Sequence, residues 1–330
     1  MSLKSAANSI SIVASLLLTA AGIVCAQSVA PYPVKPIRVV IPFAPGGTPD
    51  LQMRILEEKI TPRLGQPFVH DYRPGAAGSI GMEVAARAPA DGYTIVVGTV
   101  GSWAVNPHLY KLSYDVVSDF APIINVGSTP AVLVVHPSIP AKSVKELIAL
   151  ARQRPRELNY GSTGIGGFGH MCAELFSSMT NTRMTHVSYK GSAPALTDLV
   201  GGHIQVLFNS AIVTVPHITA GKVRVLATTG TTRMPILPNV PTLAEAGLPG
   251  YENTTWSGIA APAKTPRAHI DRLNREFADA LALPDVKERF IQSGSSVTGG
   301  TPEQLHAHVK AEFAKYARLI REAGIKAAAE

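Results

Sequence analysis

The chain has little cysteine, with only two such residues in its 330. Cys25 lies at the end of an apolar N-terminal segment, residues 10–24, which is too short for a comfortable membrane span. Small residues around Ala26 are typical of a signal peptidase site, so we expect residues 1–26 to be a secretory signal peptide cleaved near Ala26. Lipid anchoring at Cys25 is the weaker alternative, because the bulky residues before it do not suit lipoprotein cleavage.

Removal of this signal leaves Cys172 as the single cysteine, which excludes an internal disulfide in the exported chain. We interpret Cys172 as a small buried helix residue and expect stability to come from packing. The later sequence also lacks an apolar run long enough to span a membrane. It has no run of like charges and no basic patch rich in aromatic residues, which argues against nucleic-acid binding. The net charge of +7 favours small anionic ligands.

The order of expected elements indicates an α/β protein with two lobes. Short β-branched strands alternate with helices over residues 37–98, and a second such series covers residues 131–228. Each series predicts a mostly parallel sheet wrapped by helices. The helices expected between residues 266 and 324 have no strands between them and should pack onto the first lobe. We therefore assign residues 27–128 and 250–330 to lobe 1 and residues 129–249 to lobe 2, joined by two hinge crossings above a cleft.

The first strand, residues 37–41, leads through a glycine-rich turn into a helix ending near Leu64. Thr48 is suited to cap this helix, and the proline and aspartate that follow suit its first turn. Gly46 and Gly47 leave backbone amides uncovered at the helix N-terminus, which can bind a carboxylate or phosphate. A capped turn that binds nothing is the equally open interpretation.

A second glycine-rich turn contains Gly164, Gly166 and Gly169 in the spacing GxGxxG, between a strand and a helix. A dinucleotide site would place an acidic residue at the end of the next strand, but residues 185–190 contain none. No nucleotide cofactor is therefore expected. Uncovered amides for an anion are the remaining explanation for these glycines.

The histidines of the second lobe do not predict a metal site. His170, His186, His203 and His217 lack the spacing of shared metal ligands, and neither GxSxG nor HExxH occurs. One enzymatic alternative remains, a secreted α/β hydrolase with Ser162 as nucleophile and His170 as base.

Three aromatic residues fall near the expected cleft. Trp103 lies in a loop expected over residues 99–107, Phe168 in the glycine-rich turn, and Trp256 at the second crossing. Trp256 is the one we favour as a core residue. Together they predict a pocket with aromatic walls and polar amide ends, as small-molecule sites have.

With these residues in view, the chain resembles the Bug-type extracytoplasmic solute receptors, the substrate-binding proteins of tripartite tricarboxylate transporters. The resemblance spans essentially the whole chain after residue 26. It rests on PFAPGGTPD (42–50), RPGAAGSIG (73–81), ADGYT (90–94), NPHLY (106–110), YGSTGIGGFGH (160–170), YKGSAPALTDLVGG (189–202), PHITAGKVRVLATT (216–229), PTLAEAG (241–247) and WSGIAAPAKTP (256–266).

This resemblance implies a two-lobed periplasmic-binding-protein fold of type II and no enzymatic activity. It further implies that a small carboxylate is captured by lobe closure and delivered to membrane permease subunits, with the receptor acting as a monomer. A sensory protein that presents its ligand to a membrane kinase is a further alternative.

Members of this family hold the ligand carboxylate with main-chain amides and bridging waters. Carried over by position, the implied first-lobe ligand residues are Pro45, Gly46, Gly47, Thr48, Thr99 and Ser102, with Asn106 in the wall. The implied second-lobe residues are Ser162, Thr163, Gly164, Gly166, Tyr189, Lys190 and Asp198, although Asp198 has bracing of its helix as an alternative role.

Two departures from the family bear on the ligand. Asn209 stands where many relatives have an acid, which argues against a ligand amino group. Trp103 replaces a smaller or more polar residue and, with Phe168, would suit a flat ring. We therefore predict an aromatic dicarboxylate ahead of an aliphatic di- or tricarboxylate.

Overall fold

The computed structural model describes residues 32–323, which lie almost entirely in the compact unit Pro33–Glu330. The predicted signal peptide, residues 1–26, lies outside the described residues. None of the helices within residues 32–323 combines the length and hydrophobicity that a bilayer span requires.

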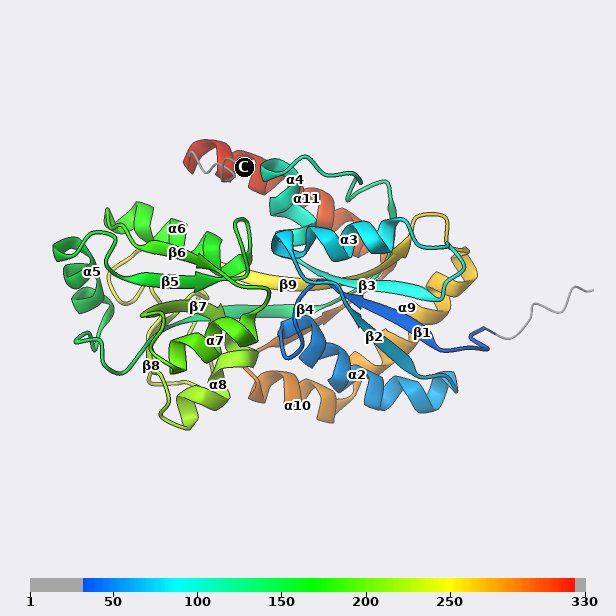
Figure 1. Ribbon diagram of the computed structural model, residues 1–330. Helices are drawn as coiled ribbons and strands as arrows, with labels where there is room; N and C mark the ends of the chain where they lie inside the picture. Colours follow the sequence, from blue (N-terminus) through cyan, green and yellow to red (C-terminus); the bar gives the residue numbers. More distant parts are fainter. Residues whose placement is uncertain (1–31, 324–330) are drawn as a thin grey trace, which may run out of the picture. The chain divides into compact units, whose positions relative to one another are not determined.

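The first sheet carries mostly parallel strands (Figure 1). It consists of β1 (Ile37–Ile41), β2 (Phe68–Tyr72), β3 (Thr94–Thr99), the first part of β4 (Phe120–Val135), β9 (Thr254–Pro262) and β10 (Ser296–Gly299). Strand β1 is parallel to β2 and β3, and β9 lies antiparallel between β3 and β4. Strands β1 to β4 therefore run in one direction, while β9 and β10 run in the other.

The second sheet repeats this arrangement. It consists of β5 (Asn159–Ser162), β6 (Thr185–Ser188), β7 (Val206–Ser210), β8 (Arg224–Thr228) and the end of β4. Strand β5 is parallel to β6 and β7, and β4 is antiparallel to β7 and β8. Loops that follow β5 and β7 therefore open at the same edge of the sheet.

The chain passes between the sheets twice. Strand β4 pairs with β9 through Pro130 and with β7 from Ala131 onward. The return passage lies between Thr229 and Thr254, where the Asn253 amide donates to the Thr229 carbonyl at 2.9 Å. The lobe boundaries at residues 128 and 250 remain a prediction.

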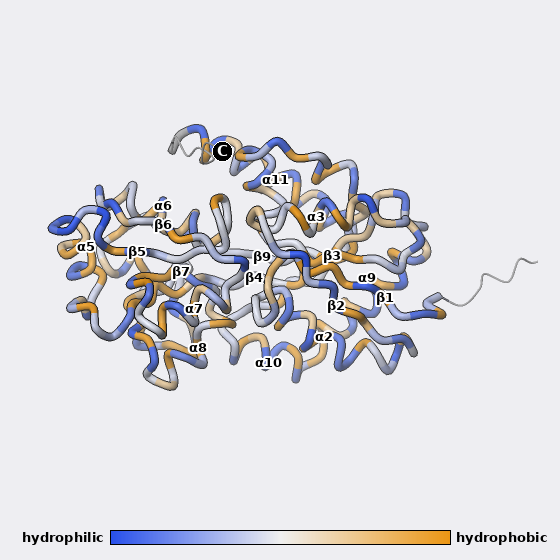
Figure 2. Tube along the Cα trace, viewed as in Figure 1, coloured by the Kyte–Doolittle hydropathy of each residue, from blue (hydrophilic) through white to orange (hydrophobic). Residues whose placement is uncertain are grey.

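Helices cover both sheets, and polar and apolar residues alternate along the outer ones, as along α5 in Figure 2. Ser143 caps α5 by accepting a hydrogen bond from the Glu146 amide at 3.2 Å. The helices are α2 (Thr48–Leu64), α3 (Ser79–Ala86), α4 (Asn106–Leu109), α5 (Val144–Gln153), α6 (Phe168–Thr180), α7 (Ser192–Val200), α8 (Ala211–Thr219), α9 (Arg267–Ala282), α10 (Pro284–Gln292) and α11 (Pro302–Ala323), with a short 3₁₀ helix η1 (Ala76–Gly78) and a π-helix η2 (Gly101–Val105).

Three elements differ from the prediction. The expected loop over residues 99–107 is mostly helical, because η2 leads directly into α4. Strand β4 begins at Phe120 rather than at Ala131, and its prolines at 122 and 130 hide it in the sequence because proline is rare within strands. Strand β10 separates α10 from α11, so the last helices are not an uninterrupted series.

Trp103 belongs to the hydrophobic core beside the first sheet, where only 1% of it is exposed. Its ring packs edge to face against Phe120, with ring centroids 5.0 Å apart. Gly98 leaves the space for the indole, since a Cβ atom there would lie 2.3 Å from the indole nitrogen. The predicted aromatic wall at Trp103 is therefore wrong. Trp256 is also buried in this core, as we favoured from the sequence.

Replacement of Trp103 should consequently affect stability. We expect Trp103→Ala to lower the free energy of unfolding by about 3–5 kcal/mol, because it leaves a large cavity in the core. Trp103→Phe should cost less, since a ring still fills part of the space. Denaturant unfolding of both variants measures this difference, and an unchanged midpoint for Trp103→Ala would place the indole outside the core.

Candidate functional site

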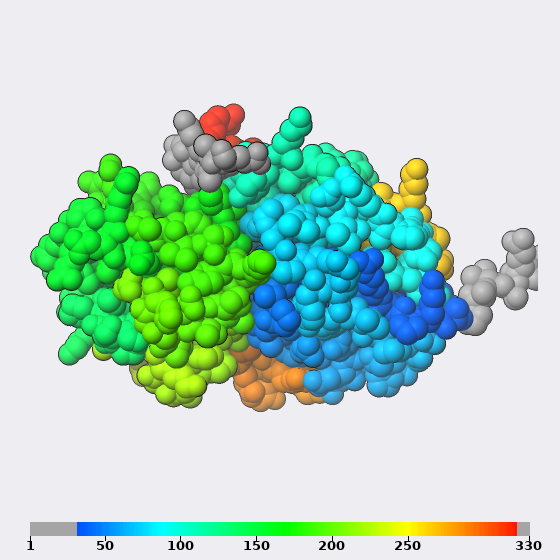
Figure 3. All heavy atoms as spheres, in the orientation of Figure 1, coloured from blue at the N-terminus to red at the C-terminus, as the bar shows by residue number. Residues whose placement is uncertain are grey.

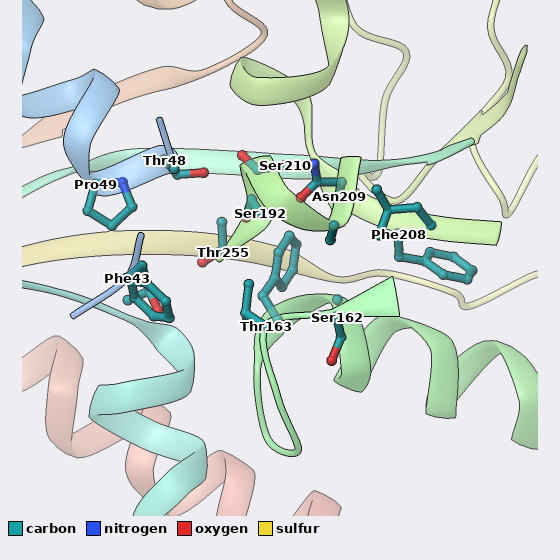
Figure 4. Close-up of a pocket in the computed structure, with 16 residues that line it drawn as sticks. Phe43, Thr48, Pro49, Ser162, Thr163, Ser192, Phe208, Asn209, Ser210 and Thr255 are labelled. Carbon is teal, nitrogen blue, oxygen red and sulfur yellow. The ribbon is translucent and has the colours of Figure 1, made fainter. Parts of the chain in front are cut away.

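A cavity lies where turns of the two sheets meet. In Figure 4, Phe43, Thr48 and Pro49 lie on one side of it, and Asn209 and Phe208 on the other. Its volume is small, about 40 Å³. The lining residues are Phe43, Gly47, Thr48, Pro49, Thr99, Ser162, Thr163, Phe168, Gly169, Ser192, Ala195, Leu207, Phe208, Asn209, Ser210 and Thr255.

Four helices begin at this cavity, namely α2, α6, α7 and α8. Their N-cap residues are Gly47, Gly167, Gly191 and Ser210, and no side chain within the described chain caps any of the four. The first amides of a helix have no partner within the helix, and the helix dipole adds positive potential there. The four ends together favour a negatively charged ligand.

The walls themselves are neutral, since none of the described residues that line the cavity is charged. Asn209, Ser210 and Thr255 are each at most 4% exposed. Their Nδ2, Oγ and Oγ1 atoms find no hydrogen-bond partner among residues 32–323. Buried polar groups are almost always paired, so these three atoms indicate a polar ligand or bound water.

Direct contacts hold the two sides of the cavity together. The Ala44 amide donates to the Lys190 carbonyl at 2.9 Å, and the Tyr110 hydroxyl donates to the Ile165 carbonyl at 2.8 Å. Gly191 makes the close approach possible, because a Cβ atom there would lie 3.0 Å from that of Ala44. Figure 3 shows the green and the blue-to-cyan segments meeting along a narrow seam. The cavity is therefore in a closed form.

Asp50 fixes the first turn of α2 beside the cavity. Its carboxylate accepts hydrogen bonds from the Gly46 amide at 2.8 Å and from the Tyr72 hydroxyl at 2.8 Å. Burial alone would raise the pKa of Asp50, but hydrogen bonds from His70, Gly46, Tyr72 and Arg54 hold it below its usual range. Asp50 therefore stays ionised.

His70 compensates the charge of Asp50. Its Nδ1 lies 3.0 Å from Asp50, and its Nε2 lies 2.9 Å from Glu57. The hydrogen bond with Asp50, followed by that with Glu57, raises the pKa of His70 to about 9 against the effect of burial. A protonated His70 and the Arg54 guanidinium keep the turn from repelling an anion.

The glycine-rich turn before α6 is braced by histidines. Ser162 Oγ lies 2.6 Å from His186 Nε2, and the Gly166 amide donates to His170 Nδ1 at 3.3 Å. The Ser162 and His170 pair of the hydrolase alternative is therefore not formed. Within residues 32–323, no group of three potential metal-ligating side chains comes together.

The structure brings seven of the predicted ligand residues to the cavity wall, and their contact with a ligand stays a prediction. They are Gly47, Thr48, Thr99, Ser162, Thr163, Phe168 and Asn209.

The other predicted residues do not line the cavity. Ser102 bonds to the Thr99 backbone, and the Tyr189 hydroxyl donates to Asp198 at 2.7 Å, so Asp198 braces its neighbourhood. Pro45 is exposed at the surface. The residues outside the lining are Pro45, Gly46, Ser102, Trp103, Gly164, Gly166, Tyr189 and Asp198, together with Asn106 and Lys190.

The sequence prediction missed part of the wall. Ser192 is the first residue of α7 and lies within the family motif at residues 189–202, and Ser210 directly follows Asn209, so both had a positional signal. Thr255 had none, because the two threonines before Trp256 do not reveal that β9 brings one of them to the cavity. The missed residues are Phe43, Pro49, Gly169, Ser192, Ala195, Leu207, Phe208, Ser210 and Thr255.

Comparison with known proteins agrees with this geometry. The family model described as "Tripartite tricarboxylate transporter family receptor" matches residues 52–325. A solved R. palustris protein with adipate is 39% identical and covers 90% of this chain and 99% of its own, with a TM-score of 0.87. The periplasmic binding protein BugD is 34% identical over 90% of this chain and 100% of its own, with a TM-score of 0.87.

A third solved protein, MatC from Rhodopseudomonas palustris with bound malate, is 30% identical. It covers 88% of this chain and 100% of its own, with a TM-score of 0.84. The fold is that of the type II periplasmic binding proteins.

The ion pairs of His70 predict a pH-dependent stability. A histidine pKa near 6.5 in the unfolded chain and about 9 in the folded one is worth on the order of 3 kcal/mol. This contribution is fully present below about pH 6.5 and is lost as the pH rises through about 9. We therefore expect His70→Gln to destabilise the protein strongly at pH 6 and much less above pH 9.

Thermal or denaturant unfolding at several pH values measures this difference. His203→Gln serves as the matched control, because His203 is exposed and its replacement should change stability by about 0.5 kcal/mol or less. A His70→Gln effect that is constant from pH 6 to pH 9 would contradict the assignment.

Proposed function

Because this chain belongs to the receptor family of tripartite tricarboxylate transporters, a family of binding proteins rather than enzymes, we propose that it captures a small dicarboxylate in the periplasm. The cavity with four uncapped helix N-termini and neutral walls carries this proposal. Closure around the ligand then prepares its delivery, as a monomer, to the membrane subunits of the transporter. Export by the signal peptide predicted for residues 1–26 belongs to the same proposal.

Main-chain amides are the groups that we propose for the first carboxylate. Thr48 and Gly169 lie in the first turns of α2 and α6, and both line the cavity. Main-chain amides bind a carboxylate without a mobile cationic side chain. The site therefore distinguishes ligands by the number and direction of the acceptor atoms that each ligand presents.

A second carboxylate suits the unpaired atoms of Asn209, Ser210 and Thr255. The Asn209 Nδ2 atom is only a donor, whereas the two hydroxyls both donate and accept. With no acidic residue in the lining, the site offers no ion pair to an amino group. A dicarboxylate therefore fits this end better than an amino acid.

An unbranched aliphatic dicarboxylate now ranks ahead of an aromatic one. With Trp103 in the core, the phenylalanines that remain in the wall are Phe43, Phe168 and Phe208. Because the cavity is small, a narrow chain requires less separation of the walls than a flat ring does. Adipate, present in the structure of a relative, is the first probe.

A calorimetric titration series with the mature chain tests the proposed function. The panel contains adipate, malate, a benzene dicarboxylate, glutamate and glucose. We expect saturable binding of adipate and weaker or no binding of glutamate and glucose. Tighter binding of the benzene dicarboxylate would restore the aromatic preference, and no binding of any carboxylate would refute the proposed function.

Asn209→Asp should weaken adipate binding at least tenfold at pH 7. Two like charges about 4 Å apart repel by about 4 kcal/mol at a protein surface, and each 1.4 kcal/mol is tenfold in affinity. The same titration with Asn181→Asp is the matched control, because Asn181 is exposed at the end of α6. Equal adipate affinities for the two variants would remove Asn209 from the site.

A further inference from the structure

His170 supports the glycine-rich turn before α6 through a bond with a fixed direction. The Gly166 amide donates to His170 Nδ1 at 3.3 Å. A backbone N–H is always a donor, so Nδ1 must carry a lone pair and the proton must sit on Nε2. The Nε2 atom faces Glu174 Oε1 at 3.9 Å. The geometry therefore requires a neutral His170 of one tautomer.

The surroundings of His170 maintain this neutral form. Its ring centroid lies 4.8 Å from that of His186 on β6 and 6.4 Å from that of Tyr160 on β5. Glu174 on the same helix is the nearby acidic group, and its carboxylate accepts the Tyr160 hydroxyl at 2.8 Å. Burial lowers the pKa of His170 to about 4. Burial, followed by the charge of a protonated His170, lowers the pKa of His186 to about 4 as well.

The turn held by His170 both walls the cavity and closes it. Ser162 and Thr163 line the cavity at the start of the turn. Gly166 has a φ of +79°, and a Cβ atom there would lie 2.8 Å from the Asn106 side chain. Ile165 lies between Thr163 and Gly166 in this turn, and its carbonyl accepts a hydrogen bond from the Tyr110 hydroxyl on the opposite side of the cavity. Loss of the hydrogen bond between the Gly166 amide and His170 would therefore shift both the part of the turn that lines the cavity and the Ile165 carbonyl that binds Tyr110.

We propose that His170 is a positioning residue whose neutral imidazole holds the glycine-rich turn in its closed shape and whose protonation at Nδ1 releases that turn. A protonated Nδ1 is itself a donor, so it can no longer accept the Gly166 amide. The proton comes from solvent, and no covalent bond changes. This role rests on the proposed function, because it concerns how the same cavity holds its carboxylate.

Protonation of His186 is expected to leave its hydrogen bond with Ser162 in place, unlike protonation of His170. The Ser162 hydroxyl can turn toward the Gly164 carbonyl, 3.1 Å away, if His186 becomes a donor. The hydrogen bond between Ser162 and His186 then survives, with His186 Nε2 as the donor. The sensitive contact is therefore the one at His170.

Two variants separate the role of the acceptor from that of the ring. In His170→Asn, the side-chain oxygen takes the place of Nδ1 but does not titrate, whereas His170→Phe keeps a ring without an acceptor. Calorimetric titration with adipate from pH 4 to pH 8 measures the dissociation constants. Adipate itself changes protonation over this pH range, but it does so equally for all three proteins. The ratio of their dissociation constants at each pH therefore reports the effect of His170 alone.

We expect His170→Asn to bind adipate within about threefold of the wild type at pH 7, and His170→Phe to bind about tenfold more weakly, as for one lost buried hydrogen bond. Below pH 5 the wild type should lose affinity more steeply than His170→Asn. Parallel pH profiles for these two proteins, or a His170→Phe variant that binds as the wild type does, would overturn the inference.

A ligand-free measurement distinguishes failure of this inference from failure of the proposed function. Nitrogen NMR shifts of His170 in the free protein should show a protonated Nε2 and an unprotonated Nδ1 at pH 7. Amide hydrogen exchange at Gly166 should be slow in the wild type and in His170→Asn, and fast in His170→Phe. A protonated Nδ1, or equal exchange in all three proteins, would refute the inference whether or not adipate binds.

Discussion

The arrangement of the site depends on four helix N-termini that meet without side-chain caps. Glycine at three of the four N-caps removes the side chain that would otherwise accept a first-turn amide. Unpaired amides are unfavourable when buried, so a cavity between such ends is stabilised by an anion that accepts their hydrogen bonds. Parallel strands lead into these helices at one edge of each sheet, which is how the fold gathers the four ends.

Because the cavity walls carry no charged side chain, the helix N-termini select a ligand by its hydrogen-bond acceptors. Asp50 supports the first turn of α2, and it is matched by His70 and Arg54 outside the cavity lining. Contacts such as that from the Ala44 amide to the Lys190 carbonyl then join the two sides directly. A ligand that adds hydrogen bonds from both sides adds to these contacts and so stabilises the closed form further.

Much of the fold could be predicted from the sequence, because strand, turn and helix follow one another with clear local signals. Thr48, Pro49 and Asp50 indicated the start of a helix at its observed position, although Gly47 rather than Thr48 is the N-cap residue. Strand β4 escaped prediction over residues 120–130 because Pro122 and Pro130 interrupt its pattern. The antiparallel position of β9 between β3 and β4 depends on long-range pairing, for which a single sequence gives no local signal.

The candidate site was predictable where it consists of turns and less so where it depends on packing. The turns at Gly47 and Thr163 were found, whereas Thr255 reaches the cavity only through the position of β9. Trp103 was misplaced because the sequence gives no signal that Gly98, at the end of an expected strand, provides the space for the indole. Which glycine frees an amide and which one makes room for a side chain is decided by the tertiary structure.

The most direct test of the account is a crystal structure of the mature protein grown with adipate. We predict that adipate occupies the cavity between the two sheets, with carboxylate oxygens within about 3.2 Å of amides at the first turns of α2 and α6, directly or through one water. Its second carboxylate should contact Asn209. An adipate whose carboxylates are held by lysine or arginine side chains, or one bound elsewhere on the protein, would contradict the claim that helix N-termini form the anion site.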